Sequence, residues 1–292
     1  MKQIDLHINA LKKTNHSEIT DFYNEATQDY KFWSNDYNMH FGYYIPFKTN
    51  TFKRDSMLNE MNNQILKKLN LSETKKTTLA DLGCGMGGSM RFMLKMNKNL
   101  SAVGITLSEF QVMHGNELLH DLNGIIIKEN YNTTSFISKT FDAAIAVESF
   151  CHSGHNKKTI TEAFRILKPN GTLVIADAFL KKNPNNLCHG SKYAYERLCS
   201  HWSLEKLEVV DKMIEHLKME GFSKIHVEDA SLRVAPSVLH VPFAILGFIA
   251  KQVWNRKGLK KESLHNLKGS FYALLSGLHL KSFGYFIITC KK

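Results

Sequence analysis

The chain has 292 residues, of which 43% are hydrophobic, and it carries a formal net charge of +11 at pH 7. This length suits one large domain, or one domain with a substantial cap, and the apolar content is ample for a buried core. Lysine and asparagine are spread along the whole chain, and no RNA-binding module is recognisable, so the charge does not predict nucleic acid as a partner. The five cysteines lack any C-x-x-C pair, which argues against a disulfide framework or a zinc site. Met1–Leu11 lacks the apolar run of a signal peptide, so we expect a cytoplasmic protein.

The first part of the chain, residues 1–75, is predicted to be helical. Apolar residues recur at helical spacing in 17–33 and in 52–71. We interpret this part as a helical N-terminal lid.

The most informative segment is the run LADLGCGMGG at 79–88. Residues 77–82 predict a strand, the glycines predict a turn and 89–96 predicts a helix. Glycine lets the backbone approach a ligand closely, and a helix N-terminus offers free N–H groups to it. The segment is therefore predicted to bind a nucleotide-type cofactor through Asp81, Gly83, Gly85 and Gly87.

Two cofactors fit this loop. Gly83, Gly85 and Gly88 match the dinucleotide pattern G-x-G-x-x-G, whereas the pattern D-x-G-x-G-x-G that begins at Asp81 is typical of S-adenosylmethionine sites. A dinucleotide site also needs an acidic residue about 20 positions further on, at the end of the second strand. That strand ends in Thr106, so S-adenosylmethionine is favoured, and a nicotinamide-dependent dehydrogenase is the remote alternative.

Strands and helices alternate through the second part of the chain, residues 76–180. Ser108 is a candidate N-cap, and Pro169–Gly171 predicts a turn. The alternation indicates a parallel sheet with helices on both faces and with ligands at the carboxyl ends of its strands. The predicted strands are 77–82, 102–106, 124–128, 141–147 and 172–177, and the predicted helices between them are 108–122 and 157–167.

The third part, residues 181–292, is predicted to complete the sheet and to cap the site. A helix capped by Ser203 is expected over 203–221, followed by a strand at 225–227 and a last strand at 283–289. Between these strands lies the predicted cap, which consists of two helices over 233–277 that are broken by Pro236 and Pro242.

The longest apolar run, Val241–Ala250, is shorter than the roughly 20 residues of a membrane-spanning helix. Three interpretations stay open for it: an ordinary buried helix, the wall of an apolar pocket, and a contact with a membrane surface. Basic residues between Lys251 and Lys268 leave a functional basic patch open as well.

Four segments in order resemble the motifs of class I S-adenosylmethionine-dependent methyltransferases. They are the glycine loop, VGITLS at 103–108, the pair FD at 141–142 with ES at 148–149, and LKPNGTLVI at 167–175. The resemblance covers 77–178. It implies a methyltransferase with a Rossmann-like, doubly wound, mostly parallel seven-stranded sheet and S-adenosyl-L-methionine as cofactor.

A narrower resemblance points to sterol and other isoprenoid C-methyltransferases and to tocopherol methyltransferases. It is carried by GITLS at 104–108, by ESFCH at 148–152 and by the aromatic segment 21–44. This resemblance implies a small apolar acceptor that is methylated at carbon, such as an isoprenoid or a related lipid. The alternative hypotheses are O- or N-methylation of a natural-product-type molecule, and a non-catalytic fold-mate that binds a nucleotide or lipid.

The resemblance also implies roles for individual residues. Glu148 or His152 is expected to take a proton, and the aromatic faces of Tyr43, Tyr44 or Phe150 to stabilise positive charge on the acceptor. The predicted cofactor-binding residues are Asp81, Gly83, Gly85, Gly87, Thr106, Leu107, Glu129, Asn130 and Tyr43, and the predicted catalytic residues are Glu148, His152 and Tyr44. No metal site is expected, and peripheral membrane contact and the oligomeric state are left open.

Overall fold

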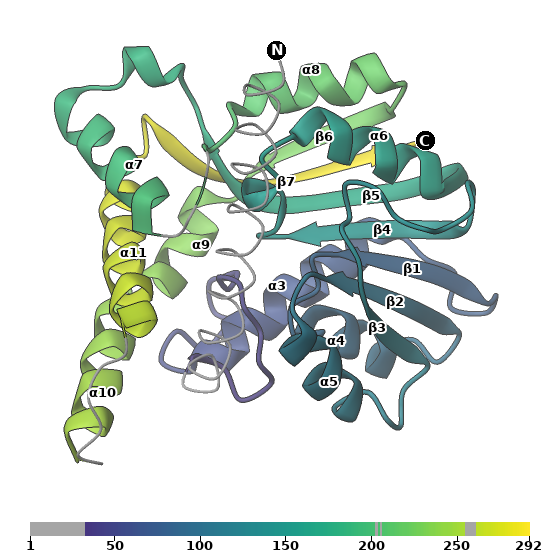
Figure 1. Cartoon of the computed structure of the whole chain (residues 1–292), viewed down its shortest axis with the longest axis horizontal. Helices are drawn as coiled ribbons and strands as arrows, with labels where there is room; N and C mark the ends of the chain where they lie inside the picture. Colours follow the sequence, from purple (N-terminus) through teal and green to yellow (C-terminus); the bar gives the residue numbers. More distant parts are fainter. Residues whose placement is uncertain (1–32, 202–203, 205, 255–260) are drawn as a thin grey trace, which may run out of the picture.

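A computed structural model of the protein describes residues 33–201, 204, 206–254 and 261–292. Its centre is one seven-stranded sheet with the strand order β3-β2-β1-β4-β5-β7-β6 (Figure 1). The strands are β1 (Thr77–Leu82), β2 (Leu100–Thr106), β3 (Gly124–Lys128), β4 (Phe141–Val147), β5 (Leu167–Leu180), β6 (Ser223–Asp229) and β7 (Phe283–Lys291). The first five strands pair in parallel, and β7 runs antiparallel to both β5 and β6. The predicted doubly wound, mostly parallel seven-stranded sheet is confirmed.

Helices cover both faces of this sheet (Figure 1). The helices are α3 (Arg54–Leu69), α4 (Gly88–Met96), α5 (Glu109–Glu117), α6 (Asn156–Ile166), α7 (His189–His201), α8 (Val210–Glu220), α9 (Ser231–Val238), α10 (Val241–Trp254) and α11 (Lys261–Leu278). The helices α3, α4 and α5 lie on one face, whereas α6 and α8 lie on the other. The remaining helices, α7 and α9–α11, gather at the side to which the carboxyl end of β4 points.

The alternation of side chains along each strand divides the core into two apolar clusters. Leu79 of β1 packs with Ile145 of β4 and the helices α3 and α4. Its neighbour Ala80 packs on the opposite face with Ala144 and α6. Because side chains alternate between faces in a strand, an uninterrupted apolar run buries both faces at once. This packing fixes where the strand ends lie, and therefore where the site can form.

Two predicted boundaries are wrong. The helix expected at 203–221 begins only at Val210, with no side-chain cap, and Ser203 lies outside the described residues. Among the described residues before it, Leu204 and Leu207 are buried in a third apolar cluster, and the extended Val209 pairs with Leu180 of β5. The helix expected at 108–122 ends at Glu117, although its predicted cap is confirmed, since the Ser108 hydroxyl accepts a hydrogen bond from the Gln111 N–H at 3.2 Å.

Two further predictions need correction. The strand expected at 172–177 extends over Leu167–Leu180 and includes Pro169–Gly171, where its register with β4 shifts. The predicted cap contains three helices rather than two. Pro236 lies inside α9. Pro242 is the second residue of α10, where a backbone N–H would make no hydrogen bond within the helix, so proline costs nothing there. The predicted helix at 17–33 lies outside the described residues except for its last one.

The apolar run of the cap is longer than the sequence analysis predicted. Ser231–Ala250, which comprises α9, the turn after it and most of α10, is long and apolar enough to cross a membrane when judged by length and composition alone. Only 22% of its most apolar window is buried inside the protein. The exposed part of this run is considered further below.

Candidate active site

One cavity of about 270 Å³ lies at the carboxyl ends of the parallel strands. This is the edge at which ligands bind in open α/β sheets. Polar residues line the part formed by the ends of β1, β2 and β3 with α4 and α5. Apolar residues from α7, from α10 and from the chain before α8 line the other part. The polar lining residues include Asp81, Ser89, Thr106, Gln111 and Asn130, and the apolar ones include Leu198, Leu204, Leu207, Val241, Ile245 and Phe248. The ends of β4 and β5 lie between the two parts, because the strand order places these strands between β1 and the cap.

The turn after β1 has the backbone that its glycines permit. Gly83 has φ +89° and Gly85 has φ +54°, a left-handed conformation that other residues rarely adopt. A Cβ added to Gly83 would lie 2.5 Å from the Ser149 Cβ, and one added to Gly85 would lie 2.8 Å from the Met39 sulfur. Both glycines line the cavity. They are therefore needed for close packing of the protein itself as well as for space at the site.

Asp81 ends β1 beneath this turn and is 2% exposed. Its Oδ2 is buried without a hydrogen-bond partner among the described residues. Burial raises the pKa of this carboxyl to about 7. A turn-capping aspartate would accept hydrogen bonds from its own turn, so this geometry indicates a carboxylate reserved for a ligand.

The ends of β2 and β3 supply neutral polar groups. Thr106 and Leu107 line the cavity, and the Thr106 hydroxyl donates to the side-chain oxygen of the buried Gln111. Asn130 also lines the cavity, and its side-chain oxygen accepts a hydrogen bond from the Asn132 N–H at 2.9 Å. Its amide nitrogen remains as a donor. This part of the cavity therefore offers hydrogen-bonding groups of the kind that hold a ribose and an adenine.

Glu148 follows β4 and faces the cavity from a backbone with φ +49°, which is uncommon for a residue other than glycine. One carboxylate oxygen, Oε1, accepts hydrogen bonds from the Phe41 N–H at 2.7 Å and from the Tyr285 hydroxyl at 3.0 Å. Burial raises the pKa of Glu148 to about 8, although both hydrogen bonds act in the opposite direction. Such a pKa lies near neutral pH, where a carboxylate is an effective general base.

A second buried carboxylate, Asp177 of β5, lines the same part of the cavity and is 1% exposed. It accepts hydrogen bonds from the N–H groups of Cys151 and Ala178 at 3.0 and 2.8 Å. Burial raises its pKa to about 6, and its negative charge contributes to the raised pKa of Glu148. Two adjacent carboxylates in a buried cavity favour a cationic ligand or a developing positive charge.

His152 lies in a short 3₁₀ turn, Phe150–His152, and also lines the cavity. Burial lowers its pKa to about 4. The imidazole is therefore neutral at physiological pH and is a weaker base than Glu148.

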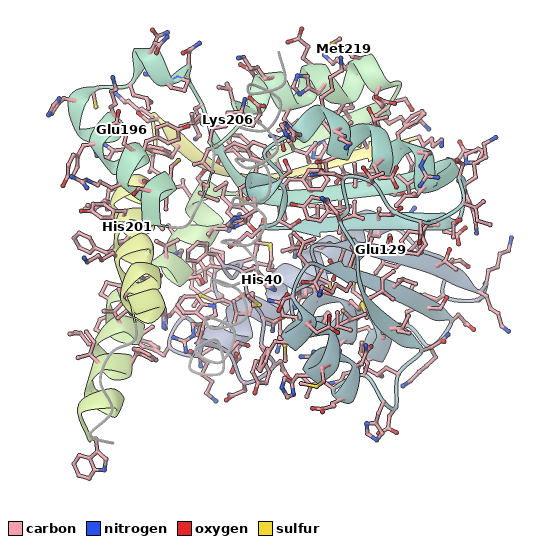
Figure 2. The ribbon with its side chains drawn as sticks, in the orientation of Figure 1. His40, Glu129, Glu196, His201, Lys206 and Met219 are labelled. Carbon is pink, nitrogen blue, oxygen red and sulfur yellow. The ribbon has the colours of Figure 1, made fainter. Side chains whose placement is uncertain are left out.

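The segment that precedes α3 closes the cavity opposite the strand ends. Trp33, Tyr37, Met39, His40 and Phe41 line it. Figure 2 shows His40 in the middle of the molecule, between the cap helices and the sheet. On α4, the Arg91 guanidinium donates to the carbonyl oxygens of Met86 and Asp36, which ties this segment to the glycine turn.

Five predicted site residues do not line the cavity. One of them, Phe150, is buried in the apolar cluster that contains α6. Gly87 is the N-cap of α4 with φ +72°, and the Glu129 carboxylate accepts hydrogen bonds from the N–H and hydroxyl of Ser135. The Tyr43 hydroxyl donates to Glu228 at 2.7 Å, and the Tyr44 N–H donates to the Arg233 carbonyl. The Tyr43 hydroxyl is thus held at β6 and the Tyr44 backbone beside α9. The chain next to them passes closely over α3, where a Cβ on Gly42 would lie 2.4 Å from the Met57 Cβ. The aromatic residues expected at 21–30 lie outside the described residues.

Two residues of the site were missed by the sequence analysis. Asp177 follows an apolar run within β5, as Asp81 follows one within β1, so the pattern that predicted one could have predicted the other. Tyr285 contacts Glu148 across 137 positions of the chain, and no local pattern indicates this contact. In the part of the chain that the structure describes, no group of three or more His, Cys, Asp or Glu is arranged to hold a metal.

Residues 80–175 match a family model described as a methyltransferase domain. They include the glycine turn, the ends of β1 to β4 and the catalytic candidate Glu148. Residues 80–175, about a third of the chain, are therefore a methyltransferase domain. The family expected from the motifs is thereby confirmed.

Curated relatives of this methyltransferase domain act on lipophilic molecules according to their names. The 2-methyl-6-phytyl-1,4-hydroquinone methyltransferase of Synechocystis sp. is 28% identical over 186 residues, which cover 63% of this chain and 58% of that protein. The 24-methylenesterol C-methyltransferase 3 of Arabidopsis thaliana is 29% identical over 160 residues, which cover 53% of this chain and 42% of that protein. The chain thus spans about half the length of these relatives.

Solved structures share the fold of nearly the whole chain. A cyclopropane synthase from Mycobacterium tuberculosis superposes with a TM-score of 0.78 at 14% identity, covering 95% of this chain and 98% of that one. The match extends beyond residues 80–175 and therefore includes the cap and the last strands of the sheet.

Proposed function

We propose that this domain transfers a methyl group from S-adenosylmethionine to carbon in a small apolar acceptor of the isoprenoid or related lipid class. The observation that carries the proposal is that three carboxylates line one cavity with an apolar wall: the buried Asp81 and Asp177, and the half-buried Glu148. Burial raises the pKa of each carboxyl, so an empty site disfavours their ionised forms. A cationic ligand favours the ionised carboxylates, because it offers them an opposite charge. The cavity therefore suits a sulfonium donor and a positively charged intermediate.

The polar part of the cavity fits the donor. The unpartnered Oδ2 of Asp81 is available to an ammonium group, and the turn at Gly83 and Gly85 leaves room beside it. Thr106 and Asn130 would hold the ribose and adenine ends. When bound, S-adenosylmethionine supplies an electrophilic methyl group on sulfur.

The chain's own residues would act mainly on the acceptor. Methylation of an alkene carbon leaves a carbocation, which then loses a proton. Glu148 and Asp177 stabilise the positive charge, and Glu148 is better suited than His152 to accept the proton because its pKa of about 8 lies closer to neutral pH. The apolar wall orients the acceptor and excludes water.

The acceptor class is inferred from two sources. The cap side of the cavity is lined by leucine, isoleucine, valine and phenylalanine side chains, which suit a hydrocarbon rather than a polar molecule. The matched relatives are named for prenylated hydroquinone and sterol acceptors. We further propose a cytoplasmic location with peripheral membrane contact, and no nucleic acid partner.

The direct test is turnover with donor that carries an isotopically labelled methyl group. The purified protein is incubated with prenylated hydroquinones, sterols and isoprenoid alkenes, and both S-adenosylhomocysteine and labelled product are measured by mass spectrometry. Fragmentation that places the label on carbon supports the proposal. Label on oxygen or nitrogen would instead establish the alternative of a natural-product O- or N-methyltransferase.

Absence of turnover with every acceptor, together with absence of donor binding, would establish a non-catalytic fold-mate. Donor binding without turnover on this panel contradicts the proposed acceptor class but not the donor.

A further inference from the structure

The helix α10 presents apolar side chains on two opposite faces. Val241, Ala244, Ile245 and Phe248 recur at the spacing of one helical face and line the cavity. Phe243, Leu246, Ala250 and Trp254 recur on the opposite face. Phe243 is 73% exposed, Leu246 is 65% exposed and Trp254 is 89% exposed. We name these four residues the outer face of α10.

A soluble protein has no evident use for such a face. Single exposed apolar residues are ordinary, but a stripe of phenylalanine, leucine and tryptophan along about three helical turns indicates a binding surface. Figure 1 shows α10 at the edge of the molecule, away from the sheet. Nothing in the described part of the chain covers its outer face.

The charge of the surrounding sequence indicates what the outer face binds. From Ser231 to Lys261 the sequence contains six lysine and arginine residues and no aspartate or glutamate. In a symmetric dimer the same surface of each subunit meets itself, so this positive segment would repel its own copy. An anionic lipid surface satisfies both the apolar stripe and the positive charge.

We propose that the outer face of α10 docks on the surface of an anionic lipid bilayer, from which the apolar acceptor enters the cavity. Docking along the surface is favoured over a membrane-spanning arrangement, because Val234, Ser237, Val241 and Phe248 of the same apolar stretch are buried within the protein. The tryptophan at the end of α10 suits the boundary between lipid and water.

This inference rests on the proposed function for the identity of the acceptor. The two faces of α10 are separated only by the thickness of one helix, about 10 Å. An apolar acceptor would therefore pass from the bilayer around α10 to the cavity without crossing bulk water. The carboxylate of Glu148 lies in the same cavity.

The test measures binding of the whole chain to lipid vesicles. Vesicles of phosphatidylcholine alone and of phosphatidylcholine with phosphatidylglycerol are mixed with the protein and separated by flotation, at low and at high salt. The test variant is Phe243→Glu with Leu246→Glu. The matched control is Met219→Glu, which changes a 67% exposed apolar residue on α8, far from α10 (Figure 2).

We expect the unchanged protein and the control to bind the anionic vesicles, and to bind them more weakly at high salt. The double variant should bind about a hundredfold more weakly, because it loses two side chains that are each worth about a factor of ten when buried. Calorimetry with S-adenosylmethionine, carried out without vesicles, should give equal donor affinity for all three. This measurement verifies folding and separates failure of the docking surface from failure of the proposed function.

Three results would overturn the inference. The first is no vesicle binding by the unchanged protein at low salt, and the second is an equal loss in the Met219→Glu control. The third is a dimer, detected by light scattering, that the double variant converts to a monomer.

Discussion

Replacement of Asp81 by asparagine should stabilise the free protein and weaken donor binding at the same time. The two effects have one cause. The carboxylate is buried with its Oδ2 unpartnered, so its charge opposes folding until a ligand provides a partner. A purely structural aspartate at this turn would give the opposite result for stability.

The magnitude follows from the pKa. Burial raises the pKa of Asp81 from 3.8 to about 7. Because the folded pKa is the higher one, the unfavourable contribution is absent below pH 3.8, grows as the pH rises and is complete above about pH 7. It reaches up to about 4 kcal/mol. A buried amide left without full hydrogen bonding offsets about 1–3 kcal/mol of the gain, so Asp81→Asn should stabilise the protein by about 1–3 kcal/mol near pH 8.

The assay is thermal unfolding with and without donor. At about pH 8 the Tm of the free Asp81→Asn variant should rise by several degrees, and this rise should shrink towards about pH 5, where the folded carboxyl is already protonated. Donor affinity should fall about 10- to 100-fold, with a smaller donor-induced rise in Tm. Asp142→Asn is the matched control, because Asp142 accepts hydrogen bonds from Thr78 and Lys168 outside the cavity. It should lower the Tm and leave donor affinity unchanged. A lower Tm for Asp81→Asn at about pH 8, with unchanged donor affinity, would refute the reasoning.

Three other substitutions test the site and the fold. Glu148→Gln should retain donor binding in calorimetry but lower turnover about 10²- to 10⁴-fold. The unchanged protein should gain activity as the pH rises through about 8, because Glu148 must be ionised to accept a proton. Full activity in the variant would show that Glu148 is not the base. Tyr285→Phe should move this rise in activity to higher pH, because the hydroxyl favours the ionised form of Glu148. A pH–rate profile that rises at the same pH in the variant would contradict the contact. Gly42→Ala should lower the free energy of unfolding in urea by about 1–3 kcal/mol, because the added Cβ would lie 2.4 Å from the Met57 Cβ. Equal stability would show that the backbone before α3 can shift to make room for the methyl group.

Sequence motifs predicted those site residues that lie within a single strand and the turn after it. Asp81, Gly83 and Gly85 lie within one strand and its turn, so their placement depends on nothing further along the chain. Thr106 and Glu148 follow strands whose apolar runs are evident in sequence. The parallel order of the sheet then brings these strand ends to one edge.

The rest of the site depends on contacts between distant segments. The hydrogen bonds of Glu148 come from Phe41 and Tyr285, more than 100 positions away in each direction. The resemblance of the aromatic segment 21–44 predicted that Tyr43 and Tyr44 face the site, but neither lines the cavity, and the chain beside them packs tightly against α3 at Gly42. No periodicity encodes such a contact, since it depends on how the segment before α3 packs against that helix.

The central claim is that the cavity beside Asp81 binds S-adenosylmethionine. Titration calorimetry tests it most directly, with the purified protein, this donor and a nicotinamide dinucleotide as the competing ligand. The account predicts one-to-one binding of the donor, weakened by Asp81→Asn, and no heat with the dinucleotide. Binding of the dinucleotide without binding of S-adenosylmethionine would contradict it.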